Sequence, residues 1–158
     1  MKIGIVITSF NNEETLEKAI KSAAILKKNN TIYIVLIDDC STDSSIEIAR
    51  LAKKKNLIDL IYINKKNLGI SRCRNIGIRL SQKTDYITFL DGDDFINPKI
   101  TKILTKKIYG DLIAFNFDYL NKDKILKNYF YNGDKELMIK DIKKYFYNYL
   151  IKPNKNSL

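Results

Sequence analysis

Short apolar runs alternate with amphipathic segments along the N-terminal part of the chain. The runs are rich in β-branched residues and predict buried strands at residues 2–8, 31–37, 57–63 and 85–90. The segments between them carry apolar residues at helical spacing and predict helices at about residues 11–28, 41–55 and 71–81. Asn11 or Asn12 is expected to cap the first helix. This alternation predicts an α/β fold whose mostly parallel sheet carries helices on both faces.

The rest of the sequence predicts another helix, a hairpin and a last helix. Asn97 and Pro98 form an N-cap and N1 pair that opens the helix. The helix is expected to end near residue 109, followed by paired strands at 111–120 and 125–131 and an amphipathic helix at about 134–150. Because no linker, repeat or low-complexity segment interrupts this pattern, residues 1–158 are expected to form one domain.

The amino-acid composition is that of an ordinary globular protein, but the net charge is strongly positive. The chain is 45% hydrophobic and 29% charged, with a formal net charge of +10. Most lysines fall at predicted helix ends, where they offset the helix dipole, and no nucleic-acid motif or basic stripe with interleaved aromatic residues occurs. Nucleic acid is therefore not an expected partner, whereas peripheral association with an anionic membrane stays open.

The length of the apolar runs and the number of cysteines indicate the cellular compartment and the redox state of the protein. The apolar runs are too short to span a bilayer, and the N-terminal segment lacks the cleavage region of a signal peptide. We therefore expect a cytoplasmic protein. Cys40 and Cys73 fit no metal-ligand spacing and are expected to stay reduced.

Polar residues follow each predicted strand, and this is where the chemistry is expected. In an open α/β sheet, ligands bind outside the carboxyl ends of the strands. The residues at these ends are Thr8 to Asn11, Asp38 to Ser41, Asn64 with Asn67 to Gly69, and Asp91 to Asp94. No G-x-G-x-x-G follows the first strand and no P-loop motif occurs, which argues against a dinucleotide oxidoreductase and a P-loop phosphotransferase.

The segment Asp91 to Asp94 crowds three carboxylates at a strand end. Carboxylates this close repel one another unless a hard cation neutralises them, and Mg²⁺ or Mn²⁺ typically bridges such groups to substrate phosphates. Gly92 would let the backbone turn tightly and admit a ligand closely. The alternative is an acid-rich turn with solvated side chains, in which Asp94 helps to cap the next helix. Position after a strand favours the metal site, facing a segment that carries Arg72 and Arg74.

Four segments, in this order, resemble family-2 glycosyltransferases of the GT-A fold. They are IVITSFNNEETLEKAIKSA, VLIDDCSTDSS, NLGISRCRNIGI and YITFLDGDDFINP, within the first hundred residues or so. They look like the family's opening strand and helix, its DDGSTD-type nucleotide loop, its N-x-G-x-x-x-A-R-N-x-G segment and its D-x-D motif. Four ordered motifs are far more specific than any one alone. The resemblance implies one GT-A-like, Rossmann-like nucleotide-sugar-binding domain over residues 1–158.

The resemblance implies a base-binding role for residues after the first two strands. Thr8 and Asp39 match positions that contact the nucleotide base, usually uracil, and Asp38 precedes Asp39 in the same loop. Each has a plainer alternative. Thr8 would then merely end a strand, and Asp39 or Ser41 would only cap the second helix.

The resemblance also implies a diphosphate and metal site. Arg74 matches the arginine near the diphosphate, and Asn67 and Gly69 shape the same loop. Asp91 and Asp93 match the two acids of the D-x-D motif, where the second coordinates Mn²⁺ or Mg²⁺ bridging the diphosphate. The plainer alternative for Arg74 is a surface ion pair, which contributes little.

The chain also departs from the family pattern. Cys40 replaces the usual glycine of the DDGS turn and Cys73 stands at a position commonly held by a small residue; both are expected to be tolerated. Relatives usually continue into an acceptor-binding region that carries the acidic catalytic base, beyond the residues matched here. The catalytic residue is therefore unassigned, because Glu136 and Asp141 match no motif.

The function implied by the resemblance is inverting, metal-dependent transfer of a sugar. The donor would be a nucleotide sugar, most often UDP-linked, and the acceptor a cell-surface glycan or lipid-linked sugar. The basic charge suits work at the inner face of an anionic membrane. The alternative is a catalytically incompetent sugar-nucleotide-binding module. A nucleotidyltransferase has less support, because TSFNNEE replaces the glycine-rich basic loop expected after the first strand.

Overall fold

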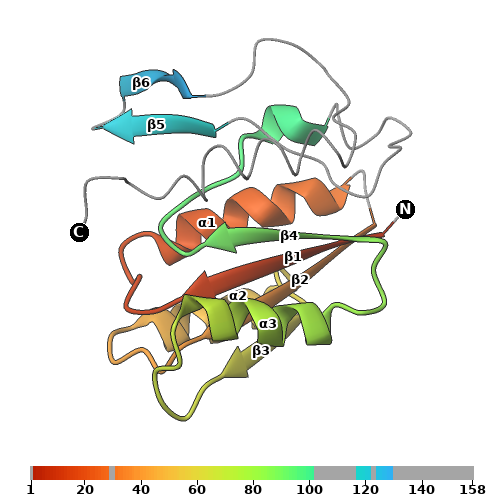
Figure 1. The fold of residues 1–158 in the computed structure, drawn as a ribbon, viewed down its shortest axis with the longest axis vertical. Coiled ribbons are helices and arrows are strands. Elements are labelled where there is room, and N and C mark those ends of the chain that lie inside the picture. Colours follow the sequence, from red (N-terminus) through yellow and green to blue (C-terminus); the bar gives the residue numbers. More distant parts are fainter. Residues whose placement is uncertain (1, 29–30, 102–116, 122–123, 130–158) are drawn as a thin grey trace, which may run out of the picture. The chain divides into compact units, whose positions relative to one another are not determined.

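Four parallel strands form the central sheet (Figure 1). This computed structural model describes residues 2–28, 31–101, 117–121 and 124–129. The strands are β1 (Lys2–Ser9), β2 (Thr31–Asp38), β3 (Leu60–Ile63) and β4 (Tyr86–Asp91). Their order is β3-β2-β1-β4, so the two strands with the longest buried runs occupy the centre. The predicted parallel sheet is confirmed.

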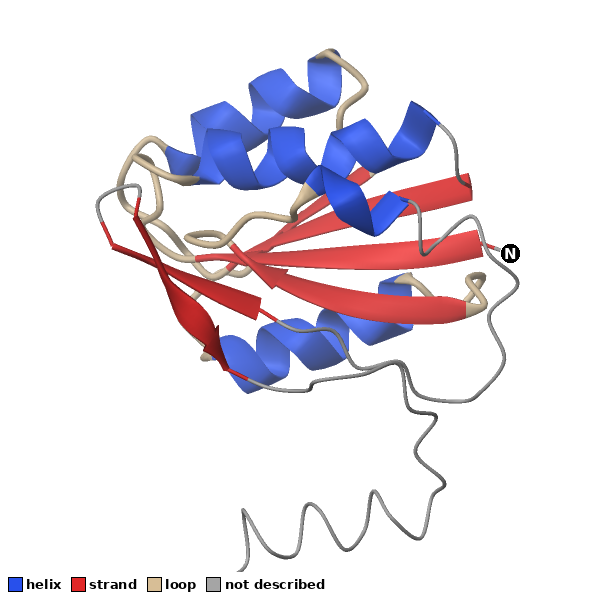
Figure 2. Cartoon of the chain, turned by 90° about the horizontal axis from the view of Figure 1, so that it is seen from above, coloured by secondary structure: helices blue, strands red, loops and turns tan. Residues whose placement is uncertain are grey.

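Helices cover both faces of this sheet (Figure 2). They are α1 (Leu16–Ala24), which continues into the 3₁₀ helix η1 (Ile25–Lys28), α2 (Ser45–Lys54) and α3 (Ile70–Leu80). Ile5 and Ile7 of β1 pack with Leu16 of α1 in a core that also includes α2. Val6 of the same strand packs with Cys73 of α3 in a second core. Because side chains alternate along a strand, β1 fills both cores, and the predicted α/β fold is confirmed.

Strand register brings three carboxyl ends to one edge of the sheet. Thr8 of β1 lies opposite Ile37 of β2 on one side and opposite Asp91 of β4 on the other. Ser9 lies opposite Asp38, the last residue of β2. The residues that follow these strands therefore emerge side by side, as the sequence predicts.

The first helix begins later than the sequence indicates. Its N-cap is Thr15, and α1 starts at Leu16, so the prediction of a cap at Asn11 or Asn12 is wrong. The backbone of Asn11 is left-handed, with φ of 52°, which ends any helical path at this residue. The carbonyl of Asn12 accepts hydrogen bonds from the N–H groups of Thr15 and Leu16, forming a turn that leads into the helix.

The third strand is shorter than predicted, because a side chain replaces part of its ladder. The Asp59 carboxylate accepts a 2.7 Å hydrogen bond from the N–H of Ile34, and the Asp59 N–H donates to the Ile34 carbonyl. Ile58 lies buried in the core before the strand starts at Leu60. Residues 57–59 thus join β2 and the core without forming a strand.

Helix η2 (Pro98–Ile100) begins as predicted. The Asn97 side chain accepts a hydrogen bond from the Lys99 N–H, and Pro98 occupies the first turn. The predicted continuation of this helix to Tyr109 lies outside the described residues.

A hairpin forms the described part of a second unit. The chain divides into two compact units, residues 1–109 and 110–158, so the second is described by itself, and the single domain stays a prediction. Strands β5 (Phe117–Asn121) and β6 (Lys124–Tyr129) pair antiparallel, with an irregularity at Asp118 and Tyr119. The predicted hairpin is confirmed. The strand start at 111–116 and the helix at 134–150 lie outside the described residues.

The helices of the described segments are short, and none has both the length and the apolar character needed to cross a bilayer. Cys40 and Cys73 are free thiols, as expected from the sequence.

Close packing of α3 on the sheet requires glycine at position 77. A Cβ at Gly77 would lie 2.1 Å from Cγ1 of Val6, a buried β-branched side chain of β1. We expect Gly77→Ala to lower the free energy of unfolding by about 2 kcal/mol in urea titrations, because overpacking outweighs the better helix propensity of alanine. Asn75→Ala, on the exposed side of the same helix, is the control and should change stability by less than about 0.5 kcal/mol. Equal stability of the two variants would contradict this packing.

Candidate functional site

A cavity of about 370 Å³ lies at the carboxyl edge of the sheet. The ends of β1 and β4, the start of the loop after β2 and the loop before α3 supply its walls. Of the residues predicted for the site, those that line it are Thr8, Asp39, Asn67, Gly69, Asp91 and Asp93. The structure thus brings together six residues that are up to 85 positions apart in sequence.

Asp91 is held by two partners on the α3 side of the sheet. Its carboxylate accepts a 2.9 Å hydrogen bond from the Thr8 hydroxyl. Nη2 of Arg74 contacts both Asp91 oxygens, at 2.9 and 3.0 Å, forming an ion pair. The Arg74 guanidinium also lies 5.5 Å from the Phe89 ring centroid, and its buried Nε has no hydrogen-bond partner among the described residues. Arg74 is therefore fixed beside the cavity, although it is not one of the residues lining it.

Asp39 fastens the loop before α3 to the end of β2. Its Oδ1 accepts from Asn64 Nδ2 at 2.7 Å and from the Leu68 N–H at 2.8 Å, and its Oδ2 accepts from the Gly69 N–H at 2.8 Å. Burial alone would raise the pKa of Asp39, but these hydrogen bonds outweigh it and hold the pKa below its ordinary value. The carboxylate is therefore ionised at neutral pH and is the anchor of this loop.

Gly69 and Cys73 lie beside Asp39, at the start of α3. Gly69 has φ of 83°, a conformation that side chains disfavour, and its carbonyl accepts from the Arg72 and Cys73 N–H groups at the start of α3. Burial, and then the neighbouring Asp39 carboxylate, raises the pKa of the Cys73 thiol to about 11. Cys73 is thus a buried thiol of low reactivity.

Asp38 does not join the residues at the cavity. It is fully buried, and its carboxylate accepts from the N–H of Ser41 at 2.9 Å and from the Ser41 hydroxyl at 2.6 Å. Side chains alternate along β2, so Asp38 shares a face with Ile34 and Leu36, in the core that α1 and α2 cover. Asp38 therefore stabilises the turn that follows β2.

Asp93 is the carboxylate of the acidic turn that lines the cavity without a described partner. It is exposed, lines the cavity and has no hydrogen bond or ion pair with any described residue. Burial raises the pKa of the neighbouring Asp94, and the charges of Asp93 and Asp91 raise it further. No cluster of three potential metal-binding side chains occurs in the described segments. A cation here would therefore depend on Asp93 and on oxygen atoms of a ligand, a coordination that suits Mg²⁺ or Mn²⁺.

Gly92 lines the cavity and is closely surrounded by its neighbours. A Cβ at this position would lie 2.6 Å from Oδ1 of Asn12 and 3.1 Å from the Thr8 carbonyl. The Gly92 N–H donates to that carbonyl at 2.8 Å, and the Thr15 hydroxyl donates to the Gly92 carbonyl at 2.9 Å. The acidic turn is thus fastened to β1 and to the start of α1.

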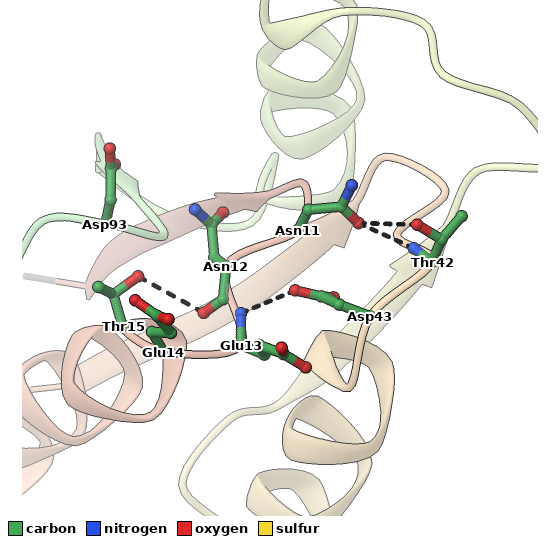
Figure 3. A pocket seen from close by; sticks show the side chains of 8 residues that line it. All are labelled: Asn11, Asn12, Glu13, Glu14, Thr15, Thr42, Asp43 and Asp93. Carbon is green, nitrogen blue, oxygen red and sulfur yellow. Dashed lines mark hydrogen bonds between the residues drawn. The ribbon is translucent and has the colours of Figure 1, made fainter.

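A second, more acidic cavity of about 460 Å³ shares Asn12 and Asp93 with the first. Figure 3 shows the residues that line it. Its lining includes the carboxylates of Glu13, Glu14, Asp43 and Asp93, and no Lys or Arg. A diphosphate would be repelled there, so the smaller cavity is the better nucleotide site.

Hydrogen bonds join the loops after β1 and β2 beside this second cavity. The Asn11 side chain accepts from the Thr42 N–H at 2.8 Å, and the Asp43 carboxylate accepts from the Glu13 N–H at 2.9 Å (Figure 3). The Glu13 carboxylate in turn accepts from the Ser44 N–H at 3.0 Å. This network was not predicted from the sequence, because its partners are about 30 residues apart and no local pattern marks them.

Comparison with known proteins decides the family. Residues 4–154 match glycosyl transferase family 2. The chain belongs to this family. An uncharacterized glycosyltransferase of Haemophilus influenzae is 38% identical over 74% of this chain and 46% of its own length. A cholesterol galactosyltransferase of Borreliella burgdorferi is 35% identical over 70% of this chain and 30% of its own. The chain thus spans less than half the length of these curated relatives.

Solved structures agree with a glycosyltransferase fold. Residues 1–349 of TarS from Staphylococcus aureus superpose with a TM-score of 0.57 at 27% identity, over 66% of this chain and 31% of that one. The mannosyltransferase PcManGT of Pyrobaculum calidifontis superposes with a TM-score of 0.56 at 15% identity, which supports the fold alone. The predicted GT-A-like architecture is confirmed.

Cys40 occupies a position where family-2 glycosyltransferases usually carry glycine. Its φ of 68° is left-handed, which disfavours any residue with a Cβ. We expect Cys40→Gly to be more stable than Cys40→Ala by about 1 kcal/mol in urea unfolding, because only glycine relieves the backbone strain. Comparison of these two variants removes the effect of losing the thiol. Equal stability would show that the turn accepts a Cβ without strain.

The anchoring role of Asp39 predicts a pH-dependent loss of stability. At pH 7, Asp39→Asn should lower the free energy of unfolding by about 2 kcal/mol, since the amide NH₂ would face a backbone N–H donor. The pKa of Asp39 is depressed in the folded protein, so its stabilisation is lost as pH falls below the ordinary carboxyl pKa of about 3.9. The difference between wild type and variant should therefore narrow from pH 5 downwards, measured by urea titration. A difference that stays constant to pH 3 would contradict this account.

Proposed function

We propose that this chain binds a nucleotide-sugar donor, with UDP as the nucleotide, in the 370 Å³ cavity. The observation that carries the proposal is the convergence of Thr8, Asp39, Asn67, Gly69, Asp91 and Asp93 on that cavity. TarS, which shares 27% identity with this chain, has been solved in complex with UDP-GlcNAc and with UDP. The base would lie toward Thr8 and Asp39, and the diphosphate toward Arg74 and Asp93.

We further propose that Mn²⁺ or Mg²⁺ is held by Asp93 at this site. Asp93 is exposed and unpaired among the described residues, whereas Asp91 is neutralised by Arg74. This division leaves Asp91 as a residue that positions Arg74 and Thr8, with Asp93 as the main protein ligand. When bound, the cation would neutralise charge that develops on the departing diphosphate.

The reaction proposed is sugar transfer with inversion. A hydroxyl oxygen of the acceptor forms a bond to the anomeric carbon while the bond from that carbon to the diphosphate oxygen breaks. Arg74, held by Asp91 and Phe89 beside the cavity, would place its positive charge near the leaving phosphate. The hydroxyl proton must pass to a base that is unassigned, since Glu136 and Asp141 lie outside the described residues.

A donor-binding module without transferase activity is the second candidate. Among the described residues at the cavity, Asp39 is engaged by the loop, Asp91 is paired with Arg74 and Asp93 is needed for the cation. None of these is left to serve as the base. Loss of general-base assistance typically slows a reaction by about 10²- to 10⁴-fold while binding persists.

The acceptor proposed is a cell-surface glycan or a lipid-linked sugar. Relatives are named for a polymer and for a lipid acceptor: TarP of Staphylococcus aureus, 31% identical over 127 residues, is a poly(ribitol-phosphate) β-N-acetylglucosaminyltransferase, and the Borreliella relative is a cholesterol galactosyltransferase. The net charge of +10 supports work at the inner face of an anionic membrane.

Calorimetric titration of UDP tests the donor site. We expect binding that requires Mn²⁺ and that Asp93→Asn weakens by on the order of tenfold or more, since a metal ligand is lost. Glu17→Gln is the control, because it removes one negative charge from an exposed ion pair with Lys21 on α1. No binding of UDP or GDP by the wild type would refute the proposal. Release of free sugar or its transfer, measured next with the labelled donor, separates the enzyme from the inactive module.

A further inference from the structure

A basic and apolar surface lies on the outer side of α3 and the loop that precedes it. Between Ile61 and Thr84 the sequence contains six basic residues and no acidic residue. Five of these basic side chains are exposed, and so are four large apolar ones; Lys83 and Ile63 are exposed but are not counted in this surface. The seven residues that are counted, called the basic face below, are Lys65, Lys66, Arg72, Arg79, Tyr62, Ile70 and Ile78.

Arg72, Ile78 and Arg79 are exposed on α3, and Ile70 lies at the start of the helix, beside the cavity. Arg72 and Arg79 are seven residues apart, which is close to two helical turns, and Ile78 is about 100° from Arg79 around the helix axis. Cys73 and Ile76 are buried in the core between α3 and the sheet. Arg72, Ile78 and Arg79 therefore point away from the core.

Tyr62 extends the surface onto the edge strand β3. It pairs with Ile37 of β2, whose side chain lies in the core on the α3 side of the sheet. Opposed residues of neighbouring strands project to the same face, so Tyr62 stands beside α3. Leu60, two residues before Tyr62 in the same strand, packs against that same core.

The charges of the basic face are not neutralised within the described structure. Lys65, Lys66, Arg72 and Arg79 form no ion pair with any described residue, in contrast to Arg74, which is paired with Asp91. Tyr62, Ile70 and Ile78 are 43%, 48% and 41% exposed. The surface thus combines unpaired cations with large apolar side chains that remain in water.

We propose that the basic face docks this protein on an anionic lipid bilayer. Lysine and arginine are attracted to the anionic headgroups, and apolar side chains among them gain by entering the headgroup region. A soluble polyanion would use the cations but would leave the Ile and Tyr side chains exposed, so the combination favours a membrane.

Docking by this face would bring the mouth of the donor cavity to the membrane. Ile70 belongs both to the basic face and to the lining of that cavity. A lipid-linked acceptor would then be held next to the donor, and this purpose rests on the proposed function. The docking itself is independent of donor binding.

Sedimentation of the 158-residue protein with lipid vesicles tests the proposal. We expect binding to vesicles containing phosphatidylglycerol and none to phosphatidylcholine alone. Each basic residue near an anionic surface contributes about fivefold in partitioning, so Lys65→Gln with Lys66→Gln should weaken binding about 25-fold. Ile78→Ser should weaken it severalfold, because burial of the side chain in the headgroup region is lost. Circular dichroism of each variant verifies that it is folded.

The control is Lys54→Gln with Lys55→Gln at the end of α2, which removes the same charge from another exposed surface. Equal weakening by the two double variants would overturn the assignment to this face, as would an absence of vesicle binding. An unchanged affinity of Ile78→Ser would also overturn it and would point to a soluble polyanion. UDP titration of the same samples distinguishes the proposed donor site from the proposed membrane docking. If the wild type binds vesicles but does not bind UDP, only the donor site is refuted.

Discussion

The Asp39 carboxylate is the group on which the geometry of the cavity depends. It accepts the N–H groups of Leu68 and Gly69 and so determines where the loop meets the end of β2. Gly69 in turn receives the first backbone hydrogen bonds of α3, and one turn later Arg74 reaches Asp91. The position of the only arginine paired at the cavity edge, within the described residues, is therefore linked to a carboxylate on another strand. Ionisation of Asp39 keeps this linkage intact, because a protonated carboxyl could not accept all three donors equally well.

The Asp91–Arg74 ion pair gives the two acids of the D-x-D turn different chemistry. Two free carboxylates at one strand end would repel each other and require a cation for stability. Here Arg74 supplies the compensation for Asp91, and the backbone of the turn is held by Thr8 and Thr15. The backbone of the turn is thus held by protein groups alone, and Asp93, which is exposed and lines the cavity, is accessible to a hydrated cation.

Much of this arrangement could be predicted from sequence because it rests on periodicity and on one rule of topology. Buried β-branched runs identified the strands, and the alignment of parallel carboxyl ends predicted that the polar residues after them gather at one edge, where the structure pairs Thr8 with Asp91. Asp38 could have been excluded by the same means, since a two-residue period places it on the face of Ile34 and Leu36. The errors at Asn11 and Asn12 have another origin. Both residues suit a helix cap locally, but Thr42 and Ser45, about 30 residues away, compete for their polar groups.

The two cysteines differ in a way that makes the protein convenient for spectroscopy. The sequence contains no other cysteine, and Cys73 is 1% exposed with a thiol pKa of about 11. A maleimide or nitroxide reagent at neutral pH would therefore react at Cys40, which is partly exposed. Cys40 directly follows Asp39 at the wall of the cavity. The departure from the family's usual glycine thus provides a natural attachment point for a single reporter group next to the ligand site.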